Sequence, residues 1–225
     1  MMTATARKDA PNRRTESKEK RRLQLIKATV RSIAKRGLSD TTMATVAGEA
    51  QLSQGIINLH FQSKERLLVE TLRYVADDYR NAWGKALDKT GPDSAEKLAA
   101  LVEVDFDRSV CDRNKIAIWF AFWGESKSRP TYRKICAERD QEYGDMLTTL
   151  CANIVSEGPY PNVDPEAVAM GLSAMSEGLW LDLLVSPDMM NPEKAKSICM
   201  AYLASLFPHH FARGHSSSGE MKRGN

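Results

Sequence analysis

Three aromatic side chains in the middle of the chain have a spacing that suits a binding surface. Trp119, Phe122 and Trp123 stand at positions i, i+3 and i+4, so they share one face of any helix that contains them. Aromatic faces attract cations through the ring quadrupole, with about 0.5–2 kcal/mol for each contact. The same spacing also occurs in the buried stripe of an ordinary helix, so a packed core is the alternative.

Two acidic residues could complete a cation site with these rings. Glu177 precedes Trp180 by three residues on one expected helix, and Asp105 precedes Phe106 on another. Carboxylates beside aromatic faces can hold a cation that has no hydrogen bond to donate. The predicted ligand site therefore contains seven residues: Asp105, Phe106, Trp119, Phe122, Trp123, Glu177 and Trp180.

The sequence carries no signature of catalysis. It has no Gly-x-Ser-x-Gly, phosphate-binding loop, dinucleotide glycine pattern or metal-ligand spacing. Its four cysteines, Cys111, Cys136, Cys151 and Cys199, form no Cys-x-x-Cys pair, a usage that fits reduced thiols. We expect no catalytic residue, no metal and no cofactor, and an enzyme is a distant alternative.

Basic residues are concentrated in the first third of the chain. Residues 1–66 carry 14 Lys and Arg against 6 Asp and Glu, a net charge of +8, whereas residues 67–225 carry a net −5. This asymmetry predicts that the first part binds a polyanion and the second does not. No uninterrupted apolar run reaches the roughly 20 residues of a membrane helix, and the start does not resemble a secretion signal. We therefore expect a cytoplasmic protein without a membrane partner.

Helical periodicity accounts for almost the whole chain, so the expected fold is all-α with about nine helices. Gly37 ends the first helix, and Thr42, Ser53 and Ser63 stand where N-caps of the next three would be. The remaining helices are expected near 94–110, 116–126, 130–156, 164–185 and 192–211. Residues 1–17 are expected to form a disordered basic arm, and residues 213–225 a disordered tail.

The stretch 41–68 has the layout of a helix-turn-helix, in which the second short helix enters the major groove of DNA. Gln54 and Asn58 fall on the polar side of that second helix and could contact base edges. Hydroxyls, a histidine and a lysine at helix ends could fix phosphates. The predicted DNA contacts are Thr41, Thr42, Ser53, Gln54, Gly55, Asn58, His60 and Lys64.

Residues 18–70 resemble the DNA-binding domain of the TetR family of bacterial repressors. The likeness rests on Thr42, on Val46-Ala47, on Ser53-Gln54-Gly55, on His60-Phe61 and on Lys64. Two positions depart from the family pattern. Gln51 replaces a common turn glycine, which predicts a strained turn. Asn58-Leu59 stands where tyrosine often precedes His-Phe, so an aromatic phosphate contact is expected to be missing.

Four further segments are similar to the BetI-type, choline-responsive repressors of this family. They are RRLQLIKAT at 21–29, GIIN at 55–58, IWFAFWGES at 118–126 and SEGLWLDLL at 176–184. The resemblance implies a repressor that a small effector, choline or another quaternary amine, releases from a palindromic operator. A TetR-type regulator that senses a neutral or drug-like hydrophobic ligand is the alternative.

The resemblance also implies a homodimer with two domains in each chain. DNA would be bound by residues 18–62, and residues 63–212 would bind ligand and pair the subunits. Recognition helices of such a dimer lie roughly 34–36 Å apart, and an effector would change their separation by tilting the helix at 63–89. The expected interface residues are Val168, Leu172, Met175, Leu179, Ile198, Tyr202 and Leu206. Burial of these faces within one subunit is the alternative.

Overall fold

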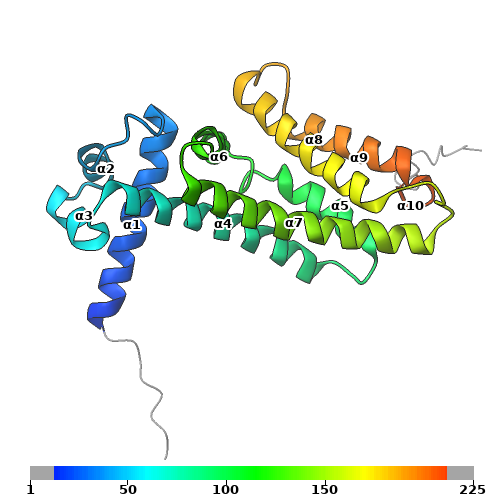
Figure 1. The fold of residues 1–225 in the computed structure, drawn as a ribbon, viewed down its shortest axis with the longest axis horizontal. Helices are drawn as coiled ribbons and strands as arrows, with labels where there is room; N and C mark the ends of the chain where they lie inside the picture. The colour runs from blue at the N-terminus through cyan, green and yellow to red at the C-terminus, as the bar shows by residue number, and fades with distance from the viewer. Residues whose placement is uncertain (1–12, 212–225) are drawn as a thin grey trace, which may run out of the picture. The chain divides into compact units, whose positions relative to one another are not determined.

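A computed structural model describes residues 13–211, and these residues fold as helices without any strand (Figure 1). There are ten helices within this range, and nine of them have at least seven residues. They are α1 (Arg13–Arg36), α2 (Met43–Ala50), α3 (Gln54–Phe61), α4 (Lys64–Lys89), α5 (Ser94–Asp105), α6 (Arg113–Glu125), α7 (Pro130–Glu157), α8 (Pro165–Val185), α9 (Pro192–Leu206) and α10 (Pro208–Phe211).

The chain forms two compact units. The N-terminal unit ends at Thr71 and the C-terminal unit begins at Leu72, so α4 starts in the first and continues into the second. In the N-terminal unit, α2 packs against both α1 and α3. Its core consists of apolar side chains at helical spacing, including Leu25, Ile26, Ile33, Val46, Ala47, Ile57, Phe61 and Leu68.

The turn between α2 and α3 confirms the conformation expected for Gln51. Gln51 is left-handed, with φ 55° and ψ 42°. Its N–H donates to the carbonyl of Gly48 over 3.1 Å, and the N–H of Leu52 donates to the carbonyl of Ala47 over 3.0 Å. This pair of bonds is a Schellman motif, which places a left-handed residue at C′. Glycine adopts this conformation without the steric cost that glutamine incurs.

Local capping chemistry sets most helix starts where the sequence predicts them. The side chains of Thr42, Asp93, Asp164 and Asn191 each accept a hydrogen bond from an N–H in the first turn of the following helix. Thr42 and Thr45 form a reciprocal capping box. Pro165 and Pro192 occupy first helical positions, where a missing N–H costs nothing. Ser53 has the extended backbone of an N-cap, but its hydroxyl makes no capping bond.

Three helix limits differ from the expectation. α1 begins at Arg13, inside the segment expected to be a disordered arm. α5 ends at Asp105 rather than near 110, because the Asp107 carboxylate accepts the N–H of Ser109 in a turn and Asp112 caps α6. The segment 192–211 is split at Pro208, since a residue before proline avoids the helical conformation. The rest of the expected arm, residues 1–12, and the tail from 213 lie outside the described residues.

The C-terminal unit is a helical bundle in which α7 packs against α5, α6 and α8. α8 packs in turn against α9. Gly171 makes this approach possible, since a Cβ there would lie 2.5 Å from Tyr202 Oη. The largest fully buried side chains of the unit are aromatic and include Trp119, Phe122, Tyr132 and Trp180.

Helix α8 is long and apolar enough to cross a membrane by length and composition. The expectation concerned uninterrupted apolar runs of about 20 residues, and α8 contains none because Glu166, Glu177 and Asp182 interrupt it. Its many small and apolar residues nevertheless keep the mean hydropathy of the helix high. A core helix of a soluble protein passes the same test, and Val168, Leu172 and Trp180 of α8 are buried inside the unit.

Candidate functional site

The outer side of α3 presents the residues expected to read bases. Ile57 and Phe61 are buried beneath the helix, while Gln54, Gly55 and Asn58 are exposed. Leu59 lies on the exposed side as well, with 72% of its surface accessible. α3 therefore rests on the core by one apolar face and offers two amides and one isolated leucine to a partner.

Two hydroxyls at helix starts border this surface. Thr42 is exposed, but its Oγ1 accepts the N–H of Thr45 over 3.1 Å and is thus engaged in capping α2. Ser53 is exposed at the start of α3 and makes no capping bond. The Ser53 hydroxyl and the first N–H groups of α3 can therefore bind an anion together.

Two of the expected DNA contacts, Thr41 and Lys64, have partners within the protein. Thr41 is only 1% exposed and donates to the carbonyl of Gly37 over 2.8 Å, so the expectation that it contacts DNA is corrected. The ammonium of Lys64 donates to the carbonyls of Leu38 at 3.4 Å and Ser39 at 3.2 Å, just beyond the end of α1. Lys64 thus ties α4 to the turn after α1, a role that the sequence pattern did not reveal.

His60 is half-buried, and its Nδ1 is buried without a hydrogen-bond partner in the described structure. Burial lowers the pKa of His60, and the positive charge of Lys18 lowers it further. Both effects favour the neutral imidazole in the protein without DNA.

One carboxylate neutralises part of the basic surface of α1. Glu49 on α2 forms ion pairs with Arg31, Lys35 and Arg36, at 3.8, 2.9 and 3.3 Å. The hydrogen bond from Lys35 lowers the pKa of Glu49. These cations brace α1 against α2, so the positive field available to a polyanion comes from other basic residues of α1, such as Lys18, Lys20 and Lys27.

The C-terminal unit buries the Asp105 carboxylate in an aromatic network. Tyr79 Oη donates to Oδ1 over 2.7 Å, and Tyr143 Oη donates to Oδ2 over 3.1 Å. Trp180 Nε1 donates to the backbone carbonyl of the same aspartate over 2.9 Å. Burial raises the pKa of Asp105 to about 6, although the hydrogen bonds from Tyr79 and Tyr143 oppose the shift. Asp105 and Trp180, two residues of the predicted ligand site, are therefore in contact.

Next to this network, the guanidinium of Arg139 lies among three aromatic rings. Its Cζ is 4.5 Å from the ring centroid of Trp119, 5.2 Å from that of Tyr79 and 5.5 Å from that of Trp123. The rings of Trp119 and Trp123 are stacked with centroids 5.9 Å apart. Nη2 of Arg139 lies 3.8 Å from Glu177 Oε1. A cage of rings and carboxylate therefore exists, and it contains a cation that belongs to the protein.

Five of the seven predicted ligand residues belong to this assembly, which we call the Arg139 cluster. The cluster consists of Tyr79, Asp105, Trp119, Trp123, Arg139, Tyr143, Glu177 and Trp180. Phe122 instead packs edge-on against Tyr132, with centroids 5.0 Å apart. Phe106 is buried as the C-cap residue of α5. For these two aromatics the core alternative describes the contacts.

Sequence reasoning missed Arg139, although the pattern of α7 contains a signal for it. Buried positions of α7 recur every three or four residues, and Arg139 falls among them between Cys136 and Tyr143. An arginine on the apolar face of a helix indicates a buried charge that needs partners. Tyr79 belongs to the apolar stripe of α4, so its hydroxyl contact with Asp105 follows only from the fold.

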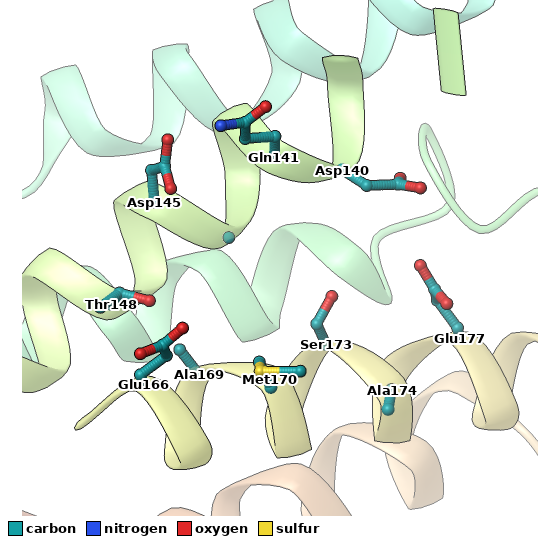
Figure 2. A pocket seen from close by; sticks show the side chains of 11 residues that line it. Asp140, Gln141, Asp145, Thr148, Glu166, Ala169, Met170, Ser173, Ala174 and Glu177 are labelled. Carbon is teal, nitrogen blue, oxygen red and sulfur yellow. The ribbon is translucent and has the colours of Figure 1, made fainter. Parts of the chain in front are cut away.

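An acidic groove lies beside the cluster, between α7 and α8 (Figure 2). It has a volume of about 370 Å³, and four carboxylates line it, from Asp140, Asp145, Glu166 and Glu177. Burial raises the pKa of Asp140 and of Glu177, and the charge of Arg139 opposes both shifts. Because Asp140 and Glu177 also pair with Arg139, the groove and the cage share one wall.

Most of the expected dimer residues on α8 and α9 are covered at least in part within the chain. Val168, Leu172 and Leu179 are buried, and Met175, Tyr202 and Leu206 are half-buried. Ile198 is the expected residue with the largest exposed share, 36%. Other apolar side chains on α8 are left in solvent, namely Met170, Leu181 and Val185.

Comparisons with known families match both units. Residues 25–71 match the family model of bacterial regulatory proteins of the tetR family. Residues 94–208 match that of the C-terminal domain of BetI-type transcriptional repressors.

Curated proteins with similar sequences are transcriptional regulators. The HTH-type transcriptional regulator BetI of Stenotrophomonas maltophilia is 32% identical over 81% of this chain and 91% of its own length. BetI 2 of Chromohalobacter salexigens is 30% identical over 90% of this chain and 96% of its own.

Solved structures share the fold. A putative transcriptional regulator from Pseudomonas aeruginosa has a TM-score of 0.75 and 27% identity, over 87% of this chain and 94% of that one. A putative regulator from Saccharomonospora viridis, solved in complex with choline, has a TM-score of 0.75 at 22% identity, over 82% of this chain and 96% of that one.

Proposed function

Because the chain belongs to the TetR family of bacterial regulators and to its BetI-type group, we propose that it is a dimeric repressor whose effector is a small quaternary amine such as choline. The chain is a ligand-responsive DNA-binding repressor, and no catalysis is part of its activity. Regulators of this family bind DNA operators and small-molecule effectors. The chromosome is their site of action, which supports a cytoplasmic location.

The observation that carries the effector proposal is the Arg139 cluster. Trp119, Trp123 and Tyr79 lie around a cation at distances typical of cation–π contacts. The Glu177 carboxylate stands at the edge of the same cage. A quaternary ammonium has no N–H to donate, so rings and a nearby negative charge are the groups that can hold it. The choline bound to the structural neighbour from Saccharomonospora viridis is a compound of this class.

For DNA binding we assign two roles to the surface of α3. Gln54 and Asn58 contact base edges in the major groove, because their amides can pair with adenine. Ser53, Thr42 and the first N–H groups of α3 bind phosphates and fix the position of the helix. Basic side chains of α1 add charge that is independent of sequence, so operator affinity should fall as salt rises.

We assign the dimer interface to the outward side of α8 and α9. Leu181 and Val185 of α8 and Ile198 of α9 are large apolar side chains exposed to solvent in one subunit and do not line the acidic groove. Gly178 has open space at its Cβ position, so a second backbone can approach there closely. A palindromic operator requires a two-fold axis, and this face would repeat around such an axis.

The effector proposal is tested by calorimetry on the wild-type protein. Choline, betaine aldehyde and glycine betaine are titrated beside 3,3-dimethylbutan-1-ol, a neutral compound with the shape of choline. Binding of a quaternary amine without binding of the neutral alcohol is the expected result. If the neutral alcohol binds as tightly as choline, shape rather than charge selects the ligand, and the site senses neutral hydrophobic compounds.

A further inference from the structure

The cage that would receive the effector is already filled. Arg139 is 5% exposed, and its guanidinium occupies the space among Tyr79, Trp119 and Trp123. We infer that Arg139 is a resident occupant of the effector site, which a cationic effector displaces into the acidic groove between α7 and α8. The inference rests on the proposed function, because it takes a cation to be the effector.

The arrangement of the three rings suits a quaternary ammonium as well as the guanidinium of Arg139. The three ring centroids lie 4.5–5.5 Å from Cζ of Arg139, within the distance of about 6 Å at which cation–π attraction operates. A trimethylammonium group has no hydrogen-bonding requirement, so it could replace the planar guanidinium among these rings without leaving a donor unpaired.

The second support is that Arg139 is poorly satisfied where it lies. Its Nε and Nη2 atoms are buried and have no hydrogen-bond partner in the described structure. Nη2 lies 2.5 Å from Asp140 Oδ1, but not in hydrogen-bond geometry, and 3.8 Å from Glu177 Oε1. Buried arginines normally satisfy their donors with acceptors. Nη2 is ion-paired with Asp140 and Glu177, but neither Nε nor Nη2 makes a hydrogen bond that departure from the cage would break.

The third support is a destination for the displaced side chain. Asp140 and Glu177 stand at one end of the acidic groove, and Asp145 and Glu166 stand at the other (Figure 2). Asp140 is 43% exposed, so a guanidinium that moves along this wall regains water. Arg139 can therefore keep both carboxylates as neighbours while its donors become solvated.

The charged groups around the cage favour a ligand with a positive charge. Three carboxyl groups surround Arg139, those of Asp105, Asp140 and Glu177. Burial raises the pKa of each, and the positive charge of Arg139 opposes the shift. Displacement of Arg139 along the groove wall leaves Asp105, which stays inside the cage, without this compensating charge. A cation is therefore the ligand that restores the balance, whereas an anion would be repelled.

Displacement would also change what packs on α4. Tyr79 touches the guanidinium with its ring and Asp105 with its hydroxyl, and it lies on the helix that begins at Lys64 in the N-terminal unit. Arg139 and the effector compete for the same cage. The apparent affinity of the protein for the effector is therefore its intrinsic affinity multiplied by the fraction of cages that Arg139 has left. Arg139 thus sets the effector concentration at which the repressor responds.

The test compares Arg139→Ala with Arg139→Lys and with Arg133→Ala, an exposed arginine of α7 that serves as the control. Calorimetry uses choline, tetramethylammonium and 3,3-dimethylbutan-1-ol. Arg139→Ala should raise choline affinity by about tenfold or more, because the competing cation is absent. Arg139→Lys should stay near the wild type, Arg133→Ala should equal it, and the neutral alcohol should gain nothing.

The outcomes separate this inference from the proposed function. If the wild type binds choline and a folded Arg139→Ala protein binds it equally or more weakly, the inference fails and the proposed effector stands. If Arg139→Ala binds choline while the wild type binds no quaternary amine, Arg139 blocks the cage without being displaced, and both the inference and the proposed effector fail. If neither protein binds any quaternary amine, both are overturned.

A second variant and a second measurement cover loss of folding. Arg139→Gln retains hydrogen-bonding capacity without charge and should gain choline affinity like the alanine variant; equal or weaker binding overturns the inference. In the wild type, hydrogen exchange at the Arg139 Nε–H, followed by NMR, should accelerate when choline saturates the protein. An Nε–H that remains equally protected at saturation shows that the side chain stays in the cage.

Discussion

The two units solve recognition in opposite ways. The N-terminal unit places polar side chains on the outside of a short helix, and an apolar core that carries no ligand contact lies beneath them. The C-terminal unit places its proposed recognition groups inside, where Asp105, Arg139 and Trp180 are buried and contribute to the core as well. Surface contacts can change without loss of folding, whereas under the proposed function each member of the Arg139 cluster would serve stability and ligand binding together.

Trp180→Ala tests this contrast with the largest expected effect. Removal of a fully buried tryptophan should lower the free energy of unfolding by about 3–5 kcal/mol, because a cavity replaces the ring. Chemical denaturation measures the change. Trp180→Phe is the matched control, since it keeps a ring but leaves the Asp105 carbonyl without the indole donor. A loss below about 1 kcal/mol for the alanine variant would mean that the site is not part of the core.

The folding stability of the protein should depend on pH through Asp105. Because burial raises the pKa of Asp105 from 3.8 to about 6, the folded protein keeps a proton there that the unfolded chain loses near pH 4. The stability that this proton contributes is complete below pH 4 and is lost as pH rises through about 6. Its size is on the order of 3 kcal/mol.

Asp105→Asn should remove this part of the pH dependence between pH 4 and 6 in urea unfolding curves. Asp107 gives a control of opposite sign, because hydrogen bonds from Ser109 lower its pKa. Its contribution is present at neutral pH and is lost as pH falls. Identical slopes for the wild type and Asp105→Asn would show that Asp105 is not desolvated.

Substitutions on the exposed side of α3 should change DNA binding more than folding stability. Asn58→Ala should cost about 1–3 kcal/mol of discrimination between operator and random DNA, because a base contact is lost. Its free energy of unfolding should change by less than about 0.5 kcal/mol. Ser53→Ala should weaken binding to both DNAs alike. Fluorescence anisotropy on both duplexes measures these effects, and equal losses for Asn58→Ala on both would remove it from base readout.

The smallest change in stability is expected at the turn between α2 and α3. Gln51→Gly should stabilise the protein by about 1 kcal/mol, because glycine relieves the left-handed backbone. Gly37→Ala, at φ 78°, should destabilise it for the same reason. Thermal unfolding compares the two, and DNA affinity should not change in Gln51→Gly. A destabilised Gln51→Gly protein would indicate that the glutamine side chain makes a compensating contact.

The same contrast explains how far the sequence could predict the molecule. Caps at Thr42 and Asp93, and the left-handed Gln51, depend on neighbours within a few residues, so their conformations could be inferred from local patterns. Thr41 could not be separated from Thr42 in this way, because adjacent threonines look alike until one is buried.

The Arg139 cluster was only partly predictable, because it joins side chains from α4, α5, α6, α7 and α8. The spacing of Trp119 and Trp123 predicts a shared face, but it cannot identify the cation that lies on that face. Phe122 has the same helical spacing and packs instead on Tyr132. Which rings surround a charge is decided by contacts between helices distant in sequence.

The most direct test of the account measures operator release. A labelled operator is bound by the full-length repressor, and choline or its neutral isostere is titrated while anisotropy is followed. We predict that choline releases the DNA, that the neutral isostere does not, and that Arg139→Ala shifts release to lower choline concentration. Operator binding that is unchanged at choline concentrations which saturate the protein by calorimetry would contradict the account.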